Sequence, residues 1–177
     1  LPVDMGEGTL VELAFDEGEV RAGGAVAAVC ELEYELIRGD LAGLARCAAD
    51  GVVLHGLWLD TVSKAERGEL LAQGLAHATP TRFQPPALPR RADGPALWRA
   101  ALGSAVAMLL PNAAALAAGS EAAEHVHQLR VAIRRLRCAV SELAPLVGAA
   151  AEPAWLPPLV ALFQALGAGR DEAALLQ

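Results

Sequence analysis

The feature that most constrains the fold is a change of sequence pattern at a proline-rich stretch. Residues 78–95, ATPTRFQPPALPRRADGP, contain five prolines, each of which fixes its φ angle and lacks a backbone donor. Strand-like runs and turn signals precede this stretch, whereas nearly everything after it has helical character. The pattern predicts an α+β chain of two domains, residues 1–77 and residues 96–177, with a linker over residues 78–95.

Charge is distributed unevenly along the chain. The 177 residues have a formal net charge of -7, and the first sixty hold 12 of the 21 acidic side chains but only three of the 14 basic ones. A net-acidic protein does not attract polyanions over its whole surface. Any anion-binding site must therefore be a local cluster of basic side chains.

Cysteine usage and hydropathy indicate the compartment. Cys30, Cys47 and Cys138 lie far apart and form no CxxC pair, which is typical of a reducing environment and predicts a cytoplasmic protein. The opening residues have neither a basic region nor an apolar core, so we expect no signal peptide. The uncharged stretch between Arg99 and Glu121 is long enough to cross a bilayer, but its alanine-rich composition favours a bundle helix.

Two strands, a turn and a short helix are predicted before the prolines. Residues 9–15 alternate apolar and polar side chains, and residues 16–18, DEG, indicate a turn that reverses the chain. Residues 25–37 have the pattern of a second strand. A helix is expected next, with Asp40 as its N-cap and Gly51 beyond its end.

Three glutamates alternate with apolar residues in the second strand, namely Glu31, Glu33 and Glu35. The period of two places their carboxylates on one face, where like charges repel one another. The simplest interpretation is an exposed sheet face in which water solvates all three. The alternative is a face that points into a cavity and binds a hard divalent cation, since Mg²⁺ prefers carboxylate oxygens.

Segments around this row of glutamates resemble a known family. The sequence CELEYELIRGD, followed by SKAERGELLAQG at residues 63–74, is similar to the C-terminal half of the CYTH domain, whose members are the triphosphate tunnel metalloenzymes. TLVELAFDEGEVRAG is similar to the strand, turn and strand that precede those motifs. The resemblance covers about residues 8–75 and implies part of a closed antiparallel β-tunnel.

The CYTH resemblance implies roles for five residues. Glu31, Glu33 and Glu35 become candidate ligands of Mg²⁺ or Mn²⁺, and Lys64 and Arg67 become candidate catalytic residues that clamp the phosphates. The implied reaction of the parent protein is metal-dependent hydrolysis of inorganic triphosphate, that of an inorganic triphosphatase-like phosphohydrolase. Spacing alone also allows a simpler interpretation, in which Lys64 and Arg67 begin a solvated helix and pair with neighbouring glutamates.

One motif of the CYTH family does not occur in this sequence. The family's ExExK strand supplies further metal ligands and a phosphate-contacting lysine, and no such run is present. The sequence therefore predicts a fragment that hydrolyses tripolyphosphate poorly or not at all by itself. The alternative is a non-catalytic polyphosphate-binding module that retains a degenerate tunnel.

After the prolines the sequence predicts helices, with breaks at Pro111, Pro145, Pro153, Gly167 and Gly169. One helix is expected over residues 120–143, with Ser120 as its N-cap. At about 100° per residue, four of its basic side chains fall within an arc of roughly 80°. This basic stripe consists of His127, Arg130, Arg134 and Arg137. Arg135 points away from it.

The basic stripe has three possible explanations. Like charges at helical spacing destabilise a helix by a few tenths of a kcal/mol per pair, so either water or an anion must compensate them. A solvated helix surface is the first explanation, and a phosphate-binding surface is the second, because guanidinium groups pair well with phosphate oxygens. A nucleic-acid-binding adaptor is the third, which the 4% aromatic content disfavours because few rings could stack on bases.

The sequence HQLRVAIRRLR resembles the signature of the CHAD domain, the conserved-histidine α-helical domain. The similarity continues downstream in LGAGRDEAALL. CHAD domains are helical bundles in two related halves that are associated with binding inorganic polyphosphate, and they often follow a CYTH domain. The resemblance implies that the contacts to polyphosphate are made by His127, Arg130, Arg134, Arg137 and Arg170. His125 lies outside the motif and is expected on the surface, and the chain is expected to hold only the N-terminal part of a CHAD domain.

Overall fold

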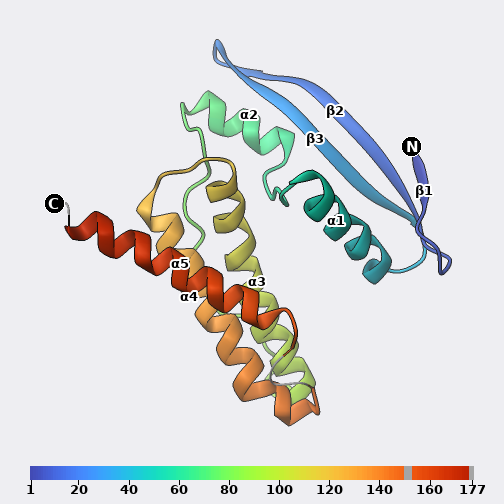
Figure 1. Ribbon diagram of the computed structural model, residues 1–177, viewed down its shortest axis with the longest axis vertical. Helices are drawn as coiled ribbons and strands as arrows, with labels where there is room; N and C mark the ends of the chain where they lie inside the picture. The colour runs from blue at the N-terminus through green and yellow to red at the C-terminus, as the bar shows by residue number, and fades with distance from the viewer. Residues whose placement is uncertain (150–152, 176–177) are drawn as a thin grey trace. The chain divides into compact units, whose positions relative to one another are not determined.

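The computed structural model describes residues 1–149 and 153–175, with side chains as far as residue 167. Within these residues the fold is α+β, as expected, because a three-stranded antiparallel sheet is followed by five α-helices. The chain divides into two compact units, Leu1–Ala78 and Thr79–Gln177 (Figure 1). Each unit is described by itself.

The sheet of the first unit has the order β1-β2-β3, with β1 at Pro2–Asp4, β2 at Leu10–Ala22 and β3 at Ala25–Arg38. β2 and β3 form one long antiparallel hairpin. Its turn lies at Gly23 and Gly24, whose φ angles of 56° and 85° suit the two-residue turns that join twisted strands. These three strands form an open sheet, so the described residues do not form a closed tunnel.

The turn expected at residues 16–18 is wrong, because β2 continues through them. The two consecutive glycines at the actual turn reach positive φ without steric cost, whereas DEG contains only one glycine. As a result Asp16 lies inside the strand ladder, directly opposite Glu31.

Two helices accompany the sheet, α1 at Leu41–His55 and α2 at Lys64–Ala72. Asp40 caps α1, as expected, and its carboxylate accepts a hydrogen bond of 2.8 Å from the Gly43 amide. Gly51 does not end this helix, since α1 continues to His55. Gly51 is instead a packing position, because a Cβ there would lie 2.1 Å from the Tyr34 hydroxyl.

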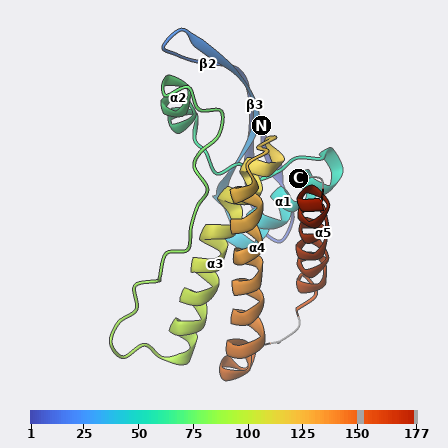
Figure 2. The ribbon, with the colours of Figure 1, turned by 90° about the vertical axis from the view of Figure 1, so that its left-hand side faces the viewer.

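The second unit contains three long helices: α3 at Gly94–Ala117, α4 at Ala123–Cys138 and α5 at Leu156–Leu175. α3 and α4 lie side by side, and α5 packs on α4 (Figure 2). A π-helical turn, Ala139–Leu143, and a 3-10 turn, Ala144–Val147, extend α4. The core is formed by apolar side chains on the facing sides of these elements, among them Met108, Leu129, Ile133 and Val140.

Three expected helix breaks do not occur. α3 passes through Pro111, and α5 continues past both Gly167 and Gly169. A proline inside a helix removes one backbone hydrogen bond, and the buried Met108 and Ala114 beside Pro111 supply packing that offsets this loss. The tertiary contacts therefore outweigh the local propensity of these residues.

The proline-rich segment forms hydrogen bonds with α3 of the helical unit. The amide of the buried Asn112 donates to the Thr81 carbonyl at 2.9 Å, and the Ser104 hydroxyl donates to the Gln84 carbonyl at 2.7 Å. Figure 2 shows the chain running alongside α3 before it enters that helix. The segment that the sequence predicts as a linker is therefore attached to α3 at Thr81 and Gln84.

α3 is also long and apolar enough to cross a membrane by length and composition. Core helices of water-soluble proteins pass the same test, so the property does not identify a span. One side of α3 packs on α4 and buries Ala105, Met108, Asn112 and Ala114.

Candidate functional site

The first candidate site is an acidic cluster on the β2–β3 hairpin, formed by Asp16, Glu31 and Glu33. One carboxylate oxygen from each lies within 4.8 Å of the others. The alternation of β3 puts Glu31 and Glu33 on one face, as expected, and the register adds Asp16 from β2. Glu35 lies further along the same face, opposite Glu12, and is not a member of the cluster.

Lys64 of α2 binds all three carboxylates of the acidic cluster. Its ammonium donates to Asp16, and lies 2.7 Å from both Glu31 and Glu33. These hydrogen bonds, the one to Asp16 foremost, raise the pKa of Lys64 above its usual range. The cluster is therefore partly neutralised within the chain.

Arg67 lies one helical turn after Lys64 and adds a second cation. Its Nη2 is 2.8 Å from an Asp60 oxygen and 3.4 Å from a Glu31 oxygen. A capping box fixes the start of this helix, since Ser63 and Glu66 exchange backbone and side-chain hydrogen bonds. The Ser63 backbone and hydroxyl donors lower the pKa of Glu66.

The acidic cluster has the oxygen donors that a hard divalent cation prefers. A cation could bind these oxygens only in exchange for the Lys64 ammonium, which already contacts all three carboxylates. Exposed acidic groups are common without a metal ion, so the geometry alone assigns none. Asp16 is the member that sequence reasoning missed, because the DEG turn was expected at its position; the adjacent glycines 23 and 24 were the signal for the true turn.

The second candidate site is the basic stripe on α4. All four expected members lie on this helix, and His127, Arg134 and Arg137 are exposed while Arg130 is half-buried. Arg170 lies beyond residue 167, outside the residues whose side chains are described. Because α4 is an α-helix, the four side chains of the stripe lie on one side of it, as the spacing predicted.

Among the side chains that the structure describes, no carboxylate pairs with the three arginines of the stripe. Glu124, the acidic residue nearest in sequence, is engaged elsewhere: it accepts a 2.7 Å hydrogen bond from Gln128 and lies 3.3 Å from Arg82. The bond from Gln128 is the main cause that lowers the pKa of Glu124, with Arg82 and His127 adding to it. As far as the described side chains show, the guanidinium donors of the stripe are not paired with a carboxylate and are available to an anion.

An aromatic ring from α5 lies beneath two of these arginines. The guanidinium carbons of Arg130 and Arg134 are 4.8 Å and 5.8 Å from the Phe163 ring centroid, which is cation–π distance. A groove of about 360 Å³ adjoins this contact. Its walls come from both helices: Ile133, Arg134, Arg137, Cys138, Val160 and Phe163.

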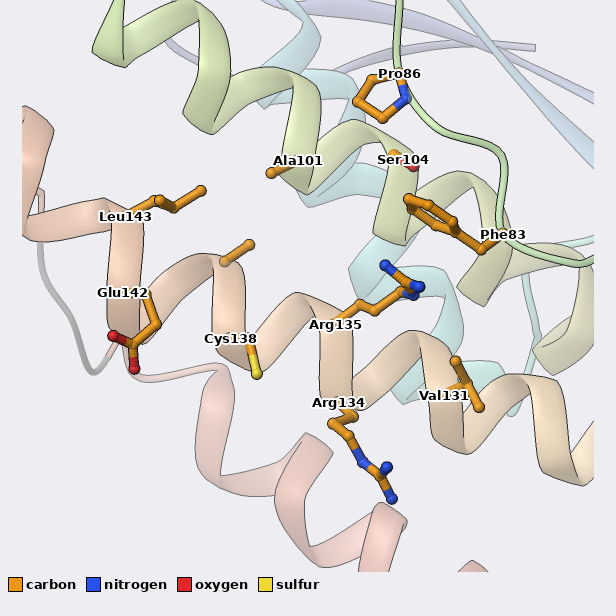
Figure 3. A pocket seen from close by; sticks show the side chains of 11 residues that line it. Phe83, Pro86, Ala101, Ser104, Val131, Arg134, Arg135, Cys138, Glu142 and Leu143 are labelled. Atoms are coloured by element: carbon orange, nitrogen blue, oxygen red, sulfur yellow. The ribbon is translucent and has the colours of Figure 1, made fainter.

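Arg135 points away from the stripe, as expected. Its guanidinium carbon lies 3.5 Å from the centroid of Phe83, a residue of the proline-rich segment. In Figure 3, Arg135 extends toward Phe83 and Arg134 extends in a different direction. Both line a second, wider groove of about 560 Å³ between α3, α4 and the proline-rich segment.

The expectation that His125 is a surface residue is wrong, because only 3% of it is exposed. Its Nδ1 lies 2.8 Å from the hydroxyl of the buried Ser120. Spacings of four, three and four residues link His125 to the buried Leu129, Ala132 and Leu136, so the helical period would have found it. Ser120 consequently does not cap α4, which begins at Ala123 without a side-chain cap.

A comparison with protein families supports one of the two resemblances read from the sequence. The similarity of the first unit to the CYTH domain stays a prediction. The matched segment begins within α3 and contains the whole of α4 and α5, and with them the basic stripe and Phe163. Residues 100–177 match the family model of the CHAD domain, a family associated with polyphosphate binding.

Proposed function

We propose that the helical unit binds inorganic polyphosphate along the basic stripe of α4. The observation that carries the proposal is that Arg130, Arg134 and Arg137 share one face and have no carboxylate partner among the described side chains. Guanidinium groups bind phosphate oxygens through two parallel N–H donors and stay charged at physiological pH. The repeated phosphates of the ligand would offset the repulsion between arginines spaced one turn apart.

Charge reversal on neighbouring residues tests this proposal. We expect Arg134→Glu to weaken polyphosphate binding by roughly tenfold or more, because it removes a phosphate contact and adds a repulsive one. Arg135→Glu is the matched control, since it makes the same change of charge one residue away on the Phe83 side of α4. Calorimetric titration with polyphosphate of defined length measures both affinities. Equal losses of affinity in the two variants would contradict binding on the side of α4 that carries the basic stripe.

Nucleic acid is the competing ligand. Duplex DNA should displace polyphosphate poorly at equal salt concentration, because the stripe is short and can neutralise only a few of the duplex phosphates. Tighter binding of DNA than of polyphosphate in that competition would overturn the proposal.

As a second function we propose metal-dependent hydrolysis of inorganic triphosphate by the parent protein, which the resemblance of the first unit to the CYTH domain suggests. The supporting observation is that Asp16, Glu31 and Glu33 lie together beside Lys64 and Arg67. Mg²⁺ or Mn²⁺ held by the carboxylates would supply positive charge that polarises a phosphoryl group. Lys64 and Arg67 would bind the phosphate oxygens of the substrate and orient it.

Phosphate release from tripolyphosphate tests this second function. We expect the 177-residue chain to show slow or no release with Mg²⁺ or Mn²⁺, because the sequence has no ExExK strand. The same chain extended by such a strand should gain activity, and Glu31→Gln in that extended chain should remove it. An extended chain that binds the metal ion and still releases no phosphate would contradict the hydrolase.

A further inference from the structure

We propose that Phe163 and Gly167 of α5 are positioning residues for the basic stripe, which hold the Arg130 and Arg134 guanidinium groups ready for phosphate. This inference rests on the proposed binding of polyphosphate by α4. Both residues lie on the part of α5 that packs on α4, four residues apart and therefore on one side of the helix. The sequence assigned neither residue a role at the stripe: Phe163 belongs to no motif, and Gly167, which lies in LGAGRDEAALL, was expected to break the helix.

Phe163 holds two like charges over one ring. Arg130 and Arg134 are four residues apart on α4, so their charges repel each other. The electron-rich face of the ring attracts both guanidinium groups, whose carbons lie 4.8 Å and 5.8 Å from its centroid. The ring therefore offsets a repulsion that would otherwise spread the two side chains apart.

This contact leaves the hydrogen-bond donors of the arginines available. A guanidinium group lies on a ring with its planar face, whereas its five N–H donors point outward in the plane. Neither Arg130 nor Arg134 has an ion pair or hydrogen bond to a described side chain. Phe163 thus fixes their position without occupying the groups that would bind phosphate.

Gly167 provides the space that Arg130 occupies. A Cβ at this position would lie 3.2 Å from both terminal nitrogens of Arg130 and 3.3 Å from its guanidinium carbon. These distances are tighter than ordinary contacts, and the group that would move is the end of a flexible side chain. A methyl group at position 167 would therefore displace the guanidinium and leave α5 in place.

The advantage of this arrangement is preorganisation. Arginine has many rotamers, and a ligand that must order two free arginine side chains loses affinity by restricting them. Side chains already held by Phe163 and Gly167 lose less freedom on binding. The same contacts place Arg134 at the groove that Phe163 helps to line.

The test uses the whole 177-residue chain, calorimetric titration with polyphosphate of defined length, and thermal unfolding of each variant. Phe163→Leu should weaken binding by about three- to tenfold, and Phe163→Trp should restore it, because tryptophan binds cations at least as well as phenylalanine. Phe83→Leu is the matched control: it removes the ring that faces Arg135 and should leave the affinity unchanged.

Gly167→Ala separates positioning from stability. Alanine favours a helix over glycine, so this variant should unfold at an equal or higher temperature. Its affinity for polyphosphate should nevertheless fall by about threefold, because the methyl group displaces Arg130. A residue with a purely structural role would not move stability and affinity in opposite directions.

Two results would overturn the positioning role. One is wild-type affinity in both Phe163→Leu and Gly167→Ala, and the other is an equal loss in Phe163→Leu and Phe163→Trp that follows their loss of thermal stability. Arg134→Glu distinguishes these from a failure of the proposed function. If Arg134→Glu weakens binding and the α5 variants do not, only the positioning role fails; if Arg134→Glu binds normally, both proposals fail.

Discussion

Lys64 in the first unit and Arg134 in the second are both basic side chains on a helix, but their surroundings differ. Lys64 donates to three carboxylates from the hairpin, and Arg67 beside it contacts one of these, Glu31, and also Asp60. Arg134 lies near an aromatic ring and has no carboxylate among the described side chains. Positive charge therefore marks an anion site only where the chain itself does not neutralise it.

The largest effect is expected from a substitution that gives the basic stripe a carboxylate partner of its own, as the cations of the first unit have. His127→Glu would place a carboxylate one turn before Arg130, where it can pair with that guanidinium. We expect polyphosphate affinity to fall by about tenfold or more, because the ligand must then compete with an internal partner and approach an added negative charge. Calorimetric titration measures the loss, and His127→Gln is the neutral control. Equal affinities for the two variants would show that the availability of the arginines is not what governs binding.

The reverse change removes the internal cation from the acidic cluster of the first unit, which should then bind divalent cations. Lys64→Gln removes the ammonium that bridges Asp16, Glu31 and Glu33, so three carboxylates are left close together. We expect this variant to be less stable than the wild type without divalent ions, and millimolar Mg²⁺ to raise its Tm by about two to four degrees. The wild type should respond less. Thermal unfolding with Mg²⁺ and with equivalent ionic strength of Na⁺ makes the measurement, and no response specific to Mg²⁺ would contradict a cation site.

A smaller effect tests whether the two units are independent. Asp40 caps α1 of the first unit, and Asp93 caps α3 of the second through a 2.8 Å bond from the Ala96 amide. Replacement of either by alanine should cost about 1 kcal/mol of the unfolding free energy of its own unit. Hydrogen exchange followed residue by residue shows which amides lose protection. Equal losses in both units from one substitution would indicate a single cooperative structure.

The smallest effect concerns the capping box of α2. Hydrogen bonds from Ser63 lower the pKa of Glu66, so its charged form is favoured in the folded chain. This contribution to stability is present above the unfolded pKa of about 4.3 and is lost as the pH falls through the lower folded pKa. Glu66→Gln should therefore flatten the acid side of the stability profile of the first unit, measured by denaturant unfolding between pH 3 and pH 7. A profile unchanged by the substitution would contradict this account.

In both candidate sites, periodicity correctly grouped the residues that belong to a single strand or a single helix. The alternation in β3 put Glu31 and Glu33 on one face, and the helical spacing of α4 put Arg130 and Arg134 on another. Such predictions need only the local geometry of a strand or a helix. They failed where a residue had two possible local roles, as at Gly51, which packs against Tyr34 and does not end its helix.

Contacts between distant segments could not be read from the sequence. Lys64 is 48 residues from Asp16, and the partnership depends on where the hairpin turns and how α2 lies on it. His125 was misplaced for a different reason: the expectation followed the family motif, although the apolar period of α4 already groups His125 with the buried Leu129 and Leu136.

The class of fold, the division of charge and the composition of the basic stripe follow from residue type and from the fixed periods of helix and strand, so they could be predicted before the structure. Tertiary packing determines which charges are neutralised and which have no carboxylate partner among the described side chains. Packing brought Lys64 to three carboxylates and brought Phe163 and Gly167 to the arginines of α4. The physical reason is that charge compensation and cation–π contact act over a few ångströms in space, whatever the separation along the chain.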